Sequence, residues 1–196
     1  MRTGFALFAT LPVLALMASC GSNTETNTVV TANNSTVTEI STETDNGTAN
    51  SVIATPAMTG QQFADAAAAS DAFEVEAGRL AQAKGTTQAV KGFGAMMVSA
   101  HTDSTRMLNT AAGSASPAIT PNAVLTPEQQ ANLDTLRSLS GVDFDAAYLG
   151  QQRTAHQKAL AALQGYATAG EVPQLRTWAE QTIPVVKAHL DDLMGM

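Results

Sequence analysis

Apolar side chains between residues 59 and 196 recur every three or four positions, which is the spacing of one face of an α-helix. The pattern predicts helices over about 61–84, 87–112, 127–168 and 172–193. Gly141 is expected to break the third helix, and Asp143 can cap the part that follows. Alternating apolar and polar runs typical of strands are scarce, so the sequence predicts an all-α fold.

The ends of these helices carry recognisable signals. Gly85 and Gly170 follow predicted helix ends, and Thr126 precedes a proline in the order expected at a helix start. Residues 113–126 contain two further prolines and are predicted to form a loop. Short turns at Gly85 and Gly170 make each helix pair antiparallel, which predicts an up-down four-helix bundle over residues 59–196.

Two glycines lie inside the second predicted helix. Gly92 and Gly94 both lower its intrinsic helix propensity. A glycine in a helix also lets a neighbouring backbone approach closely, which is an interpretation that fits both residues.

The N-terminus has the features of an export signal. Arg2 precedes residues 4–18, an apolar run of about 15 residues, whereas a membrane-spanning helix needs ~20. The run ends in Leu-Met-Ala-Ser-Cys, which is similar to the lipobox of bacterial lipoproteins, with Met17 where leucine is usual. Cys20 is the one cysteine of the chain. We therefore expect a signal peptide over residues 1–19 and lipidation of Cys20.

A polar segment separates Cys20 from the predicted helices. Of the 38 residues from Gly21 to Met58, 20 are Thr, Asn or Ser, and none is basic or aromatic. Such a composition cannot bury enough apolar surface to offset the entropy lost on ordering, so residues 20–58 are predicted to be a disordered tether. Gly21, in place of Asp, favours the outer over the inner membrane by analogy with lipoprotein sorting in Gram-negative bacteria.

The formal net charge of −7 limits the partners that the chain can bind. Loss of Arg2 with the signal peptide would make the charge one unit more negative. An acidic protein is repelled by phosphate backbones, so nucleic-acid binding is not expected. The expected partner is the membrane, through the lipid on Cys20, and no protein partner is indicated.

The three histidines of the chain fall on three different predicted helices, each on the apolar stripe. They are His101, His156 and His189, and Glu74 has the same position on the first helix. Measured from the end with the two glycine turns, these four residues lie roughly 24, 21, 28 and 16 Å along the bundle at ~1.5 Å per residue. Asp71 lies at a similar height but toward the edge of its stripe.

Imidazole and carboxylate groups suit transition metals, and bundle cores commonly hold them. Glu74, His101, His156 and His189 therefore form a candidate metal site. A buried polar network in which the histidines only make hydrogen bonds fits the same pattern, as does acid–base catalysis. A ferritin-type di-iron site is disfavoured because no histidine is preceded by Glu-x-x. No catalytic residue is assigned, and a non-catalytic role is preferred over an enzymatic one.

Several short pieces share their order and spacing with a known family. They are residues 74–81, 90–94, 97–98 with His101, 140–145 with Tyr148, His156, and 183–184 with 189–190. On these pieces, residues 63–193 resemble the exported bacterial family called domain of unknown function 4142, sometimes labelled as outer-membrane proteins. The resemblance implies a ferritin-like helical bundle without an established activity. Ala100 departs from it, because the family usually has an aspartate just before the histidine.

These observations predict a membrane-anchored, periplasm-facing envelope lipoprotein of unknown biochemical activity, with a candidate metal-binding cluster of histidine and glutamate in a ferritin-like bundle. The alternative is a non-catalytic interaction or envelope-stress protein whose buried histidines are structural.

Overall fold

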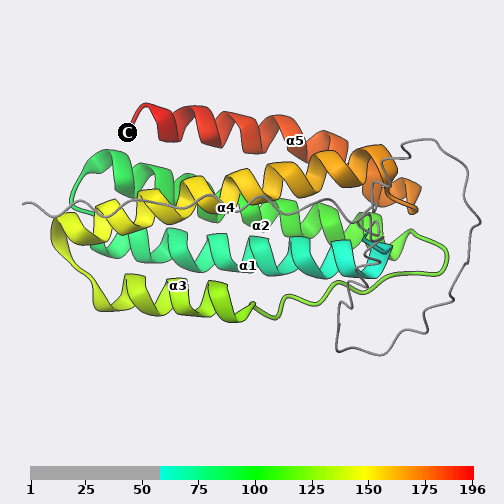
Figure 1. Ribbon diagram of the computed structural model, residues 1–196, viewed down its shortest axis with the longest axis horizontal. Coiled ribbons are helices and arrows are strands. Elements are labelled where there is room, and N and C mark those ends of the chain that lie inside the picture. The colour runs from blue at the N-terminus through cyan, green and yellow to red at the C-terminus, as the bar shows by residue number, and fades with distance from the viewer. Residues whose placement is uncertain (1–57) are drawn as a thin grey trace, which may run out of the picture. The chain divides into compact units, whose positions relative to one another are not determined.

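Five α-helices make up the part of the chain that the computed structural model describes, residues 58–196. They are α1 (Gly60–Lys84), α2 (Gln88–Gly113), α3 (Pro127–Ser138), α4 (Gly141–Ala169) and α5 (Pro173–Met194) (Figure 1). No strand occurs among these residues, so the predicted all-α fold is confirmed. None of the five helices is both long and apolar enough to cross a membrane. The predicted signal peptide, Cys20 and the tether as far as residue 57 lie outside the described residues.

Capping boxes explain where two of the helices begin. The hydroxyl of Thr59 accepts a hydrogen bond from the backbone N–H of Gln62, and the Gln62 side chain accepts one from the backbone of Thr59. Thr126 and Gln129 form the same capping box at the start of α3. Each box satisfies two backbone donors that the first helical turn leaves free, so the start of the helix is encoded locally.

The predicted break at Gly141 separates α3 from α4. Gly141 has a φ of 63°, in the left-handed region that favours glycine. Ser140 occupies the N-cap position of α4. The prediction that Asp143 caps this helix is wrong, because Asp143 lies inside its first turn.

The helices pack as two hairpins with one added helix. α1 packs chiefly against α2, and α4 against α5, while smaller contacts join α1 to α4 and α2 to α5. The short α3 lies along the outside of α1, as Figure 1 shows, and also contacts α4. The four long helices therefore enclose a common interior, which α3 covers from one side.

This interior contains two apolar clusters. One includes Phe63, Leu108, Leu163 and Trp178, and the other includes Phe73, Phe93, Phe144, Tyr148 and Leu193.

A polar layer separates these two clusters along α2, α4 and α5. Along α1, the polar layer begins after the last residue of the first cluster. It contains every buried polar or charged side chain of the described residues: Asp71, Glu74, His101, Gln152, His156 and His189. Polar groups are expensive to bury, and their confinement to one level marks that level as the candidate site.

Candidate metal centre

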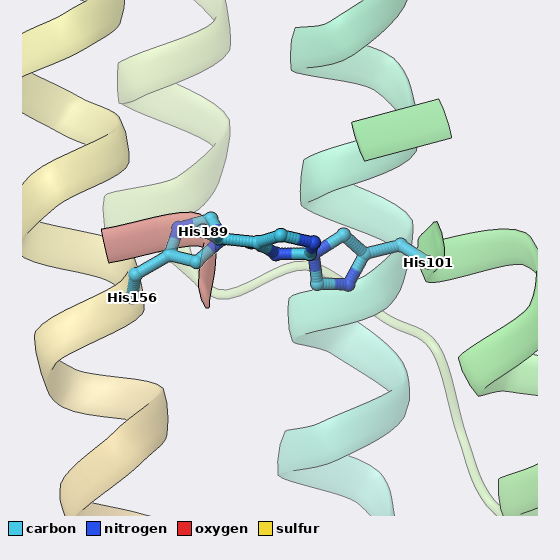
Figure 2. A group of neighbouring side chains, drawn as sticks. All are labelled: His101, His156 and His189. Atoms are coloured by element: carbon cyan, nitrogen blue, oxygen red, sulfur yellow. Dashed lines mark hydrogen bonds between the residues drawn. The ribbon is translucent and has the colours of Figure 1, made fainter. Parts of the chain in front are cut away.

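Three histidines from three helices meet in the middle of the polar layer. His101 comes from α2, His156 from α4 and His189 from α5, and their rings point toward one another (Figure 2). The side chains are buried, with exposed fractions of 8%, 2% and 4%. One ring nitrogen from each lies within 4.8 Å of the others. The sequence-based expectation that these residues come together is therefore met in the structure.

Asp71 of α1 holds the ring of His101. Nδ1 of His101 lies 2.7 Å from Oδ1 of Asp71, and both side chains are buried. Nε2 of His101 is also buried and has no hydrogen-bond partner among residues 58–196. The carboxylate thus fixes the ring through one nitrogen and leaves the other available inside the cluster.

A backbone carbonyl holds the ring of His156 in a similar way. Nδ1 of His156 lies 2.9 Å from the carbonyl oxygen of Gln152. A carbonyl can only accept a hydrogen bond, so Nδ1 carries the proton and Nε2 has the free lone pair when the ring is neutral. Nε2 lies 3.2 Å from Nδ1 of His189. The ring of Phe93, with centroids 6.3 and 6.4 Å away, packs beside both histidines.

Glu74 lies next to the histidines without joining them. Its Oε2 accepts a hydrogen bond of 2.6 Å from Nε2 of Gln152, and its Oε1 is 3.8 Å from Nδ1 of His156. That nitrogen already donates to the Gln152 carbonyl, so the Glu74–His156 contact is not a strong ion pair. Among the described residues, the group whose ligand atoms meet within 4.8 Å is the three histidines.

Burial and the charges of neighbouring groups shift the pKa values of the three histidines in different directions. Burial, together with the charges of His101 and His189, lowers the pKa of His156 to about 3. Burial and the charge of His101 lower the pKa of His189 to about 4. Burial alone would lower the pKa of His101, but the hydrogen bond to Asp71 and the charges of Glu74 and Asp71 raise it overall. His156 and His189 are therefore neutral at pH 7, as metal ligands must be.

The charge of Glu74 also depends on its surroundings. Burial raises its pKa to about 7, against the opposing effects of His101 and of the Gln152 hydrogen bond. A pKa near 7 leaves Glu74 only partly ionised at pH 7. A divalent cation bound nearby would favour its ionised form.

The geometry fits a metal with imidazole ligands. With bonds of ~2.0–2.1 Å and tetrahedral angles, ligand nitrogens lie about 3.3 Å apart. The 3.2 Å between His156 and His189 is already close to this value, and the limit of 4.8 Å for the whole group requires only small ring movements. A metal-bound histidine usually donates its other N–H to a carboxylate or a carbonyl, and Asp71 and Gln152 supply one of each.

Sequence reasoning missed the role of Asp71. Its height along α1 matched the histidines, but the apolar stripe placed it at an edge. In the structure that edge faces α2, and Asp71 is 4% exposed. Residue 100, where the family resemblance led us to expect an aspartate, is alanine. The carboxylate that holds His101 comes from the neighbouring helix.

Comparison with known proteins agrees with the fold. The crystal structure of a DUF305 fragment from Deinococcus radiodurans is similar, with a TM-score of 0.60 and 17% sequence identity over 71% of this chain and 97% of that one. At this identity the likeness concerns the fold alone. No curated protein matches the chain. Residues 46–196 match a family model described as "Domain of unknown function (DUF4142)". The chain therefore belongs to the DUF4142 family.

Proposed function

We propose that this protein binds a divalent transition-metal ion between His101, His156 and His189. The observation that carries the proposal is the geometry of the three rings. Their nitrogens meet inside the protein, and Asp71 and the Gln152 carbonyl hold two of the rings from behind. Three histidines leave at least one coordination position open in a tetrahedral site, as in catalytic zinc centres, whereas structural zinc sites usually have four protein ligands. Glu74 is a further buried carboxylate in the same polar layer.

Metal titration tests this proposal directly. The chain with Cys20→Ser is suitable because it removes the one thiol that could compete for metal. We expect elemental analysis to find about one ion per chain after dialysis against Zn²⁺. Co²⁺ should give the intense visible bands of a tetrahedral site. A protein that retains no Zn²⁺ and gives only the spectrum of hydrated Co²⁺ would rule the proposal out.

Asp71→Asn should weaken metal binding without removing a ligand. Loss of the carboxylate behind a ligating histidine typically costs ~10–100-fold in metal affinity, so the Kd for Zn²⁺ should rise by about that factor. Asp103→Asn is the matched control, because Asp103 is on the same helix as His101 and its side chain is 68% exposed. Competition titration with a chromophoric chelator measures both. Equal Kd values for the two variants would mean that Asp71 does not support the site.

The alternative function is a non-catalytic interaction or envelope-stress role with structural histidines. The hydrogen bond between His156 Nε2 and His189 Nδ1 favours it, since this contact gives each of the two nitrogens a partner within the protein. The two functions differ in one measurable property. That property is the response of the Tm to chelators and added metal. The Tm should stay the same if the histidines form a structural network, and it should change if they form a metal site.

We further propose that the domain is a ferritin-like up-down four-helix bundle carried at the cell envelope by a lipid on Cys20. The pairing of α1 with α2 and of α4 with α5 supports the bundle. The N-terminal run that ends at Cys20 supports the signal peptide and the lipid. The outer membrane and the periplasm-facing orientation rest on Gly21 and on the tether.

Cys20→Ser tests the anchor. The variant should move completely from the membrane fraction to the soluble periplasmic fraction, because its attachment depends on the acyl chains. Fractionation at high salt followed by immunoblotting measures this, and Ser19→Ala, which keeps the cysteine and a small residue before it, serves as the control. If Cys20→Ser still sediments with membranes, the anchor lies elsewhere.

A further inference from the structure

A cavity of about 290 Å³ follows one face of α4, with residues from all five helices in its wall. Gln151, Ala155, Ala159 and Leu163 line it at every fourth position of this helix. Residues four apart lie one above the other on the same face, so the cavity follows α4 for about three turns, or ~18 Å at ~1.5 Å per residue. On α1, which runs antiparallel to α4 (Figure 1), the wall covers residues 63–73. The cavity is therefore elongated along the bundle.

The inner part of this wall is apolar. It includes five buried side chains, each 2–5% exposed: Phe63, Phe73, Leu163, Trp178 and Val186. Two polar side chains beside them have partners within the protein, because Asp71 is hydrogen-bonded to His101 and Thr182 to the backbone carbonyl of Trp178. A hydrocarbon ligand would leave neither of these two groups unsatisfied, and its burial here would remove apolar surface from water.

Small side chains leave this space unfilled. The wall includes Ala67 and Ser70 on α1, and Ala155, Ala159 and Ala162 on α4. Protein interiors are normally packed as closely as organic crystals, and an unfilled cavity lowers stability. A ligand that fills the cavity would regain the missing contacts, and its shape must match an elongated space.

The mouth of the cavity lies between α3 and α4. Glu128 and Lys158 line it, and their side chains are 64% and 61% exposed. The two form an ion pair of 2.6 Å with each other. Among the described residues of the wall, the exposed charges are this pair, so the mouth offers no unpaired charge to a ligand. The polar end of a ligand is therefore expected in the water at the mouth, while its apolar part carries the binding.

The volume limits the length of the chain that fits. A cavity of ~150 Å³ holds benzene, so by proportion this one has room for roughly ten to twelve carbon atoms. We propose that it binds the hydrocarbon chain of a single unbranched aliphatic molecule, such as a medium-chain fatty acid, with the polar end at the mouth. Metal binding is not required, because the chain makes no bond to His101, and neither His156 nor His189 lines the cavity.

Calorimetric titration with straight-chain fatty acids tests the proposal on the protein with Cys20→Ser. EDTA is present throughout, so that a carboxylate cannot bind through a metal ion and the result is independent of the metal proposal. From hexanoate to decanoate the Kd should fall about fourfold per added methylene, since each one buries more apolar surface. From dodecanoate to tetradecanoate it should hardly change, because the added carbons remain in water. No binding, or an undiminished fall between the last two acids, would overturn the proposal.

A branched isomer tests the shape of the site. The compound 2-propylpentanoate has the same atoms as octanoate, but its longest chain is three carbons shorter. At about fourfold per methylene, it should bind at least about tenfold more weakly than octanoate. Equal Kd values for the two isomers would contradict an elongated site.

Substitutions of alanine by leucine locate the site. Ala155→Leu and Ala159→Leu each fill part of the cavity, whereas Ala161, on the same helix, is exposed and does not line it. Each of the first two variants should weaken decanoate binding at least about tenfold, and Ala161→Leu should leave it unchanged. Thermal unfolding shows which variants are folded. A folded Ala155→Leu or Ala159→Leu protein that binds decanoate like the wild type would place the ligand elsewhere and contradict the proposal.

Discussion

Replacing His156 with alanine is expected to abolish metal binding and the thermal stabilisation that metal gives. His156 contributes the nitrogen nearest to His189 and is 2% exposed, so neither water nor another side chain can easily replace it. At a free metal concentration of 1,000 times Kd, binding stabilises the wild-type fold by ~4 kcal/mol. For a domain of this size that is a rise of roughly 10–15 °C in Tm. Calorimetry of the wild type and the variant, with and without Zn²⁺, measures the difference.

Gln157→Ala is the matched control, because Gln157 is the exposed neighbour of His156 on the same helix. It should retain the full metal-dependent rise in Tm. The structural alternative predicts a different result. In that case His156→Ala should lower the free energy of unfolding by ~1–3 kcal/mol, because its hydrogen-bond partners are left unsatisfied. Zn²⁺ should then change the Tm of neither the wild type nor the variant.

The second large effect concerns the contact between α1 and α2. Gly94→Ala should destabilise the fold by ~1–3 kcal/mol through overpacking. A Cβ at Gly94 would lie 2.7 Å from the Ala81 Cβ and 2.7 Å from the backbone oxygen of Gly78. Such distances are too short for unstrained contacts, and a backbone cannot move aside as the end of a flexible side chain can. Urea unfolding at equilibrium gives the change in free energy.

Gly92→Ala, two residues away on α2, is the comparison. A Cβ at Gly92 would meet nothing within 4 Å. The same substitution should therefore stabilise the protein by up to ~1 kcal/mol through helix propensity. Opposite signs for the two variants are the expected result. If both variants were stabilising, the close approach of α1 and α2 would be wrong.

The positions of the helices could be predicted from local sequence signals. Their apolar periodicity and caps act over a few residues, so the signals at Thr126 and Gly141 could be found without tertiary information. The sequence also placed His101, His156 and His189 at one level, since the rise of a helix per residue is nearly constant. Height along a bundle follows from counting residues, and this is why the histidine cluster was predictable.

Which neighbour each side chain meets depends on how the helices pack. The edge of the α1 stripe that carries Asp71 could face solvent or α2, and the rotation of α1 about its axis brings it to His101. The same packing makes Gly94 a close contact and leaves Gly92 open. Helix periodicity fixes angles within one helix but not the rotation of one helix against another. That rotation depends on how side chains from distant parts of the chain interlock, which is settled only when the helices pack together.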